Sequence, residues 1–177
     1  MKKTILFLVS ILFFSCGTEV PKGSLDLDKV DKVRLISYPS RTFWGMNKKI
    51  LSSDGKINID KEYIIDDLFL NKQSQSELFS IFKHKELTEV NAACYEPRHL
   101  FVFYNDKGKI LGDYELCLDC GNAGRSENLD YLPNFSIEKG EKLKELLIDL
   151  KLKNIGHNSQ IVRQKERVLL SKQLNKE

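Results

Sequence analysis

The chain has 177 residues, of which 41% are hydrophobic and 10 are phenylalanine. This length and composition suit one domain with a buried core and exclude a globally disordered chain. The formal net charge is +3, but without Lys2 and Lys3 of the leader, 26 basic residues stand against 25 acidic ones. A near-neutral domain lacks the basic surface that nucleic acid requires, so we expect no nucleic-acid partner.

The chain begins with a short, strongly apolar segment. Met1-Lys2-Lys3 supplies positive charge, and residues 5–14 are apolar except for Ser10. A segment of this length is too short to cross a bilayer as a helix. Residues 1–15 are therefore expected to be a cleavable export signal peptide.

The end of this leader, Phe13-Phe14-Ser15-Cys16, resembles a bacterial lipobox, although Phe13 stands where leucine is commonest. With its MKK start and FFSCG ending, the leader is similar to those of Bacteroidota lipoproteins. The resemblance implies cleavage before Cys16 and acylation of Cys16 by palmitate-like chains, which would anchor the protein to a membrane of the cell envelope, facing the periplasm or the cell surface. The alternative is an ordinary secretory leader with Cys16 near its cleavage site by coincidence.

The segment after Cys16 is predicted to be a tether followed by a strand. Residues 16–28 contain Gly17, Pro21 and Gly23, which is typical of a short linker. Residues 30–38 alternate between apolar and polar side chains before Pro39, and this period of two predicts a strand. The folded domain is expected to start at residue 29.

A hairpin and a further strand are expected next. The Asp54-Gly55 pair lies between the runs 48–51 and 56–59, and this pattern is typical of the turn of a β-hairpin. Residues 63–70 are expected to continue as another strand. A helix then begins near Asn71 or Ser74, because Ser74 and Glu77 have the spacing of a capping box.

A second helix is predicted after Ser136, which has the side chain of a good N-cap. Four leucines at three- and four-residue spacing give this helix its apolar face. The order of strands, helix, hairpin and helix indicates an α+β fold, in which about two helices pack on an antiparallel sheet within residues 29–155. Residues 156–177 are polar, and we expect a frayed helix or disorder rather than a partner-binding helix.

The central hairpin gathers the remaining cysteines. Residues 99–104 are apolar on both faces, which predicts an inner strand, and residues 105–109 supply a turn at Gly108. A two-residue turn pairs residues whose numbers sum to 215, whereas a three-residue loop gives 214. Either register brings Cys94, Cys117 and Cys120 to the open end of the hairpin.

Four interpretations of this cysteine cluster remain open. Cys94 could form a structural disulfide with Cys117 or Cys120 and leave one free thiol, as an oxidising envelope favours. Cys94, Cys117, Cys120 and His99 could instead form a Cys₃His zinc site. The Cys117-x-x-Cys120 pair could be a redox centre. Finally, Cys94 and His99 could be a catalytic dyad, with Glu115 facing His99 in the 214 register.

A second candidate site is a cluster of aromatic and cationic residues that could be exposed. Arg41, Phe43 and Trp44 follow Pro39, and together with Arg98 they could form a ligand platform. The alternative is a loop that packs its aromatic side chains onto the core. No complete catalytic constellation can be assembled, so we expect a non-catalytic binding or structural domain without a cofactor. A zinc-binding or thiol-redox module is the other hypothesis.

One longer pattern resembles a known group. The residues Cys94-Tyr95-Glu96-Pro97-Arg98-His99, then Phe103-Tyr104, then Cys117-x-x-Cys120 are similar to a CYxPRH…FY…CxxC pattern of uncharacterised exported Bacteroidota proteins. The resemblance covers about residues 90–150 and implies no activity.

Overall fold

The computed structural model describes residues 21–46, 48–52, 55–85 and 93–175. Its strands are β1 (Lys32–Ser37), β2 (Asp66–Phe69), β3 (His99–Tyr104), β4 (Ile110–Cys117) and β5 (Asn122–Arg125). Its α-helices are α1 (Lys72–Lys83), α2 (Ile137–Asp149) and α3 (Gln160–Leu174). Short 3-10 turns are η1 (Leu27–Lys29), η2 (Arg41–Phe43), η3 (Lys61–Tyr63) and η4 (Glu127–Leu129). The predicted signal peptide and Cys16 lie outside the described residues.

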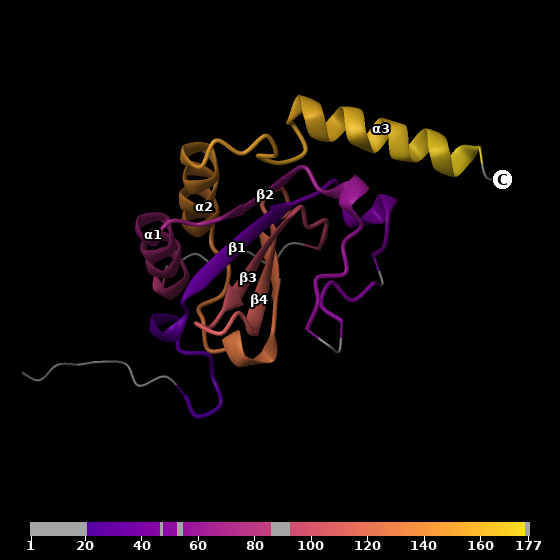
Figure 1. The fold of residues 1–177 in the computed structure, drawn as a ribbon. Helices are drawn as coiled ribbons and strands as arrows, with labels where there is room; N and C mark the ends of the chain where they lie inside the picture. Colours follow the sequence, from indigo (N-terminus) through magenta and orange to yellow (C-terminus); the bar gives the residue numbers. More distant parts are fainter. Residues whose placement is uncertain (1–20, 47, 53–54, 86–92, 176–177) are drawn as a thin grey trace, which may run out of the picture.

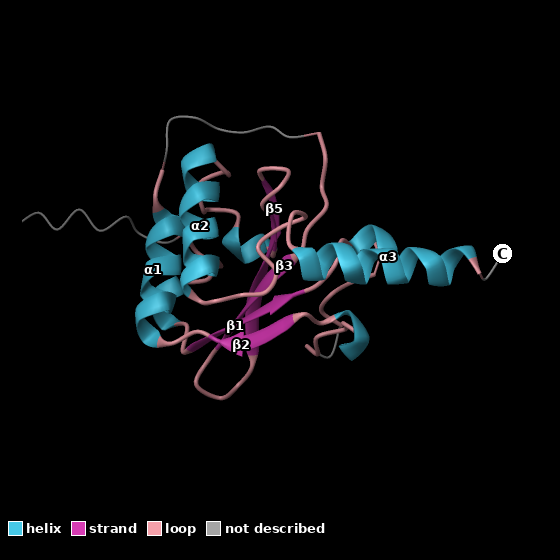
Figure 2. Ribbon diagram, turned by 90° about the horizontal axis from the view of Figure 1, so that it is seen from above, coloured by secondary structure: helices cyan, strands magenta, loops and turns pink. Residues whose placement is uncertain are grey.

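The five strands form one antiparallel sheet in the order β2-β1-β3-β4-β5. Helices α1 and α2 cover one face of this sheet, and the segment between β1 and β2 lies on the other (Figure 1). Figure 2 shows α3 on the side away from α1 and α2. The predicted α+β class with an antiparallel sheet is confirmed.

The core has two parts because both faces of the central strands are covered. Phe101 and Phe103 of β3 pack with Phe82 of α1 in the larger part. Leu100 and Val102, which alternate with them along the same strand, pack with the segment between β1 and β2. A strand buried on both faces shows no polar alternation, and this explains why residues 99–104 are predicted correctly as an inner strand.

Both predicted helix starts are found, and the first helix begins after Asn71 rather than after Ser74. Asn71 caps α1, because its side-chain oxygen accepts the Ser74 N–H at 2.8 Å. Ser136 caps α2 as predicted and accepts the Lys139 N–H at 3.0 Å. A side-chain acceptor at this position satisfies a backbone donor that the helix itself cannot.

The hairpin predicted at 48–59 is short: a single bridge joins Leu51 to Ile57, and the Ser52 N–H donates to the Lys56 carbonyl at 2.9 Å. Ser53 and Asp54 of its expected turn lie outside the described residues. The central β3–β4 hairpin combines both predicted registers. The loop pairs Asn105 with Lys109, and a bulge beside Tyr104 then shifts the rest of the ladder to the 215 register.

Two predicted boundaries are wrong. The domain starts before residue 29, since Leu25 and Leu27 of the segment predicted as tether are buried in the core. The tail is not frayed or disordered over residues 160–174: α3 forms there and buries Val162 and Leu169. None of the helices in the described part of the chain combines the length and apolar character that a membrane span requires.

Candidate functional site

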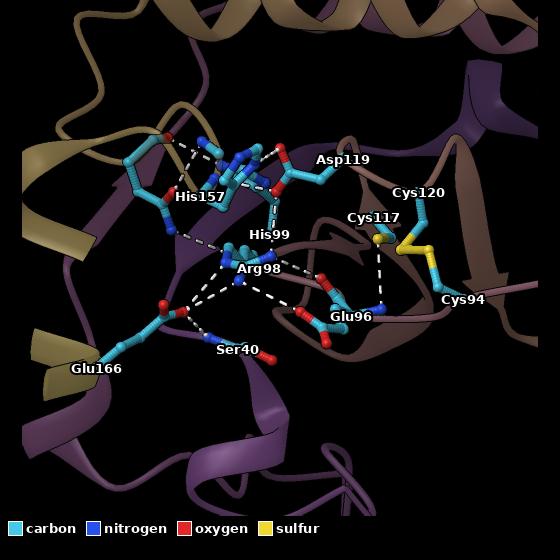
Figure 3. A network of polar contacts seen from close by, with 12 residues as sticks. Ser40, Cys94, Glu96, Arg98, His99, Cys117, Asp119, Cys120, His157 and Glu166 are labelled. Carbon is cyan, nitrogen blue, oxygen red and sulfur yellow. Dashed lines mark hydrogen bonds and ion pairs between the residues drawn. A yellow bond between two sulfur atoms is a disulfide. The ribbon is translucent and has the colours of Figure 1, made fainter. Parts of the chain in front are cut away.

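The sulfur cluster lies at the open end of the β3–β4 hairpin, as the turn arithmetic predicts. Cys94 and Cys120 form a disulfide with their Cα atoms 5.7 Å apart, and the Cys117 sulfur lies beside it (Figure 3). This Cα–Cα separation is ordinary for a disulfide. In the chain-entropy model, a bridge between residues 26 positions apart stabilises the fold by roughly 3.5 kcal/mol.

Cys117 is the free cysteine of the described residues, and it is buried. The Glu96 N–H donates to its sulfur at 3.3 Å. Burial raises the pKa of the Cys117 thiol, and the thiolate is the reactive form. A thiol of this kind is suited to packing, and its CxxC partner, Cys120, is already bonded to Cys94.

His99 lies away from the sulfurs. Its ring is fully buried, and Nε2 lies 2.9 Å from the Asn154 carbonyl oxygen. Burial lowers the pKa of His99 to about 4, so the ring is neutral at pH 7 and Nε2 donates its proton to that carbonyl. Nδ1 has no hydrogen-bond partner among the described residues.

The contacts of Cys94, Cys120 and His99 agree with the disulfide interpretation. The Cys₃His set is not assembled, because Cys94 is bonded to Cys120 and His99 is held by Asn154. The described residues contain no group of three or more His, Cys, Asp or Glu side chains that could hold a metal ion. The Cys94–His99 dyad is not formed either. Glu115 pairs with Leu100 rather than with His99, since the ladder has the 215 register.

Arg98 is the centre of a polar network beside the disulfide (Figure 3). It is only 5% exposed. Its guanidinium donates to the carboxylates of Asp119 at 3.0 Å and Glu166 at 3.1 Å, and it lies 3.5 Å from Glu96. The Ser40 N–H donates to the same Glu166 oxygen at 2.8 Å. Arg98 therefore ties β3 to the turn after β4 and to helix α3.

His157 extends this network toward the surface. Its backbone N–H donates to Asp119 at 3.0 Å, and Nδ1 lies 2.7 Å from the other oxygen of the same carboxylate. Asp119 thus connects the loop before α3 to Arg98. The segment predicted to be a polar tail is thus held to the domain by polar contacts in addition to the buried Val162 and Leu169.

A second buried network is centred on Glu115 of β4, which pairs with Leu100 of β3. Its Oε1 accepts the Tyr38 hydroxyl at 2.5 Å, and its Oε2 accepts Tyr95 at 2.9 Å and Arg41 at 3.0 Å. Both carboxylate oxygens therefore accept hydrogen bonds from buried or partly buried side chains. The role of Glu115 is to pair the buried Arg41 charge.

Sequence reasoning missed this network because its members are far apart in the chain. Tyr38 and Glu115 are 77 positions apart, and no local spacing relates them. One signal was present: a glutamate in an apolar strand such as 110–118 needs a buried partner on the same face. Asp113, two residues earlier on that face, is partly buried, and burial raises its pKa to about 6.

The predicted platform of Arg41, Phe43, Trp44 and Arg98 is not an exposed surface. Arg41 and Trp44 are each 7% exposed, and Arg98 belongs to the other network. Trp44 stacks on Tyr63 at 5.2 Å between ring centres, which agrees with the alternative that the loop packs its aromatics onto the core. Phe43 and Trp44 still line a pocket of about 410 Å³ beneath α3.

In the networks centred on Arg98 and Glu115, the charged side chains pair with one another. The candidate nucleophile Cys94 is in a disulfide, and the candidate base His99 is fully buried. A reaction needs a nucleophile and a base within hydrogen-bond reach in an accessible site. Cys94 and His99 do not form such a pair in this structure. No protein-family model, curated protein or solved structure matches this chain.

Proposed function

We propose that this protein is a membrane-tethered lipoprotein of the bacterial cell envelope whose folded domain binds a ligand without catalysis. The observation that supports it best is the Cys94–Cys120 disulfide, because disulfides of this kind persist in oxidising compartments outside the cytosol. The resemblance of the leader to Bacteroidota lipoprotein leaders supports the same compartment.

The position at which the chain joins the domain suits such a tether. The Leu25 N–H donates to the Asn128 carbonyl at 2.8 Å, and the Leu25 side chain is buried. A tether from Cys16 would therefore span residues 17–24. A linker of this length would hold the domain close to the membrane surface.

The proposal that the domain is not catalytic rests on the internal contacts of its potentially reactive side chains. Cys94, His99 and Glu115 are the candidate catalytic side chains raised from the sequence, and each is held in an internal contact. Turnover in a broad screen of hydrolase and reductase substrates would contradict this part. Binding without turnover is the expected outcome.

The tether is tested by mass spectrometry of the mature N-terminus after expression of the full chain in a bacterial host that processes lipoproteins. The expected terminus is Cys16 with the added mass of its acyl chains, and the protein should fractionate with membranes. Cys16→Ser should be released in soluble form, whereas Cys117→Ser should stay with the membrane. An unmodified terminus at another residue would overturn the proposal.

A further inference from the structure

Helix α3 carries a large share of the apolar side chains at the protein surface. Four of the nine large hydrophobic residues that are exposed in the described part of the chain belong to this one helix of 15 residues. They are Ile161, Val168, Leu170 and Leu174, the last with 66% exposure. Single exposed apolar residues are normal, but several of them gathered on one element indicate a surface for interaction.

The charges on the outer side of α3 are positive. Arg163 and Arg167 are exposed, and the side chain of Arg163 donates to the Asn158 carbonyl at 2.8 Å. The side chain of Arg167 makes no hydrogen bond or ion pair with any described residue. Glu166, the acidic residue of α3, is turned inward and pairs with Arg98. The outer side therefore carries two guanidinium charges that no carboxylate of the described residues neutralises.

The two arginines share one stripe of α3 with two of the exposed leucines. This outer stripe has spacings of four, three and four positions and consists of Arg163, Arg167, Leu170 and Leu174. Side chains at such spacings are neighbours on one face of a helix. The stripe is thus cationic in its first half and apolar in its second half. Beside the arginines, Gln160 and Gln164 complete the lining of an open hollow without a carboxylate among its lining residues.

The outer stripe is accessible in the described part of the structure. Figure 2 shows α3 on the side away from α1 and α2. In Figure 1, α3 lies along the top of the domain, whereas residues 21–27 enter the domain at the lower left. Neither the other two helices nor the described N-terminal segment therefore covers the stripe.

We propose that the outer stripe of α3 binds the surface of an anionic lipid bilayer. Such a surface supplies phosphate headgroups for the arginines and, directly beneath them, hydrocarbon for the leucines. A polyanion without apolar surface would match the arginines alone. A basic helix that also exposes apolar side chains is typical of segments that lie in this interface. The proposal goes beyond the binding role inferred above and does not depend on acylation of Cys16.

Sedimentation with lipid vesicles tests the proposal, using the Cys16→Ser chain purified after cleavage of the leader. This variant brings no acyl chain of its own to the vesicles. Vesicles of phosphatidylglycerol and phosphatidylcholine in equal parts should bind it at least about tenfold more tightly than phosphatidylcholine alone, because each arginine contributes about fivefold at an anionic surface. Soluble glycerol phosphate, which has the anionic group without the acyl chains, should not displace the protein at equal phosphate concentration.

Two matched pairs of variants locate the contact. Arg167→Ala should weaken binding to the mixed vesicles by about fivefold, whereas Lys144→Ala, which removes an exposed charge from α2, should change it by less than about twofold. Leu174→Asp should weaken binding by at least about fivefold, with Ile148→Asp on the exposed side of α2 as its control. The Arg167 pair keeps the test decisive if Leu174→Asp fails to fold, as thermal unfolding would reveal.

Three results of the vesicle assay would overturn the proposal. The first is no binding to the mixed vesicles, or equal binding to vesicles with and without phosphatidylglycerol. The second is binding that Arg167→Ala and Leu174→Asp leave unchanged, which would place the contact outside the outer stripe. The third is displacement by glycerol phosphate, which would indicate a site for a small anion. Self-association of the chain that Leu174→Asp abolishes would also overturn it, because a second copy would then be the occupant.

Discussion

The guanidinium of Arg98, the residue before β3, lies 3.1 Å from the carboxylate of Glu166 on α3, although the two residues are 68 positions apart. Both side chains are largely buried, and the Ser40 N–H shares the same glutamate oxygen. This contact holds the C-terminal helix on the domain. It also explains how a segment with few buried apolar residues can still be ordered.

Arg98→Met should destabilise the fold by about 3–5 kcal/mol, because it leaves the carboxylates of Asp119 and Glu166 without their buried partner. Methionine keeps much of the side-chain volume, so the decrease in the free energy of unfolding measures mainly the loss of the positive charge. Urea unfolding measures it, and Arg167→Met on the exposed side of α3 should change stability by less than about 0.5 kcal/mol. Equal losses in the two variants would contradict this role.

Tyr38→Phe should lower stability by about 1.5–3 kcal/mol, since it removes the hydroxyl that donates to the buried Glu115 carboxylate at 2.5 Å. The same substitution in a Glu115→Gln background should cost less, because the charge that strengthens the hydrogen bond is gone. A double-mutant cycle from chemical unfolding gives the coupling. Additive effects would show that the two side chains do not interact.

The structure separates what local patterns encode from what they do not. The caps at Asn71 and Ser136 and the inner strand 99–104 could be predicted, since each depends on residues adjacent in the chain. Helix α3 could not, because its buried residues Val162 and Leu169 are mixed with exposed apolar ones. A period of 3.6 is hidden when apolar residues occur all round a helix.

The candidate site shows the same division. Turn arithmetic at Gly108 was enough to bring three cysteines together, because an antiparallel ladder fixes which residues face each other. It could not tell which two would bond, since that choice depends on side-chain direction at the open end, where Cys94 lies before β3 and Cys120 lies between β4 and β5. Nor could it show that Arg41 and Arg98 are buried, because their partners come from distant strands and from α3.

His99 gives the fold a defined sensitivity to acid. Burial lowers its pKa from 6.5 to about 4, so the unfolded chain binds the proton more tightly than the folded chain. The contribution of His99 to stability should therefore fall as the pH drops from about 6.5 to 4, by up to about 3 kcal/mol. His99→Gln, followed by urea unfolding across this range, should lack that part of the slope. An unchanged slope would contradict the assignment.

Asp113 should act in the opposite direction. Burial, and then the nearby charge of Glu115, raise its pKa from 3.8 to about 6, so the folded chain binds this proton more tightly than the unfolded chain. Its contribution is present below about pH 3.8 and is lost as the pH rises to 6. Asp113→Asn should therefore be more stable than the wild type at pH 7, by about 1–3 kcal/mol, and show no gain at pH 3.5.

These two slopes overlap between about pH 4 and 6 and partly cancel in the wild type. The single variants should consequently have steeper pH profiles than the wild type, with opposite signs. Asp106→Asn, in the exposed β3–β4 turn, is the control for Asp113→Asn and should follow the wild-type profile. Parallel profiles for all the variants would show that neither buried group titrates as described.

The central claim is that Cys94 and Cys120 staple the open end of the hairpin in an exported domain, while Cys117 stays a buried thiol. Peptide mapping of the unreduced mature protein, denatured and alkylated before digestion, tests it most directly. The account predicts alkylation at Cys117 alone and a linked pair of peptides that contains Cys94 and Cys120. Alkylation of all three cysteines in protein purified from the envelope would contradict it.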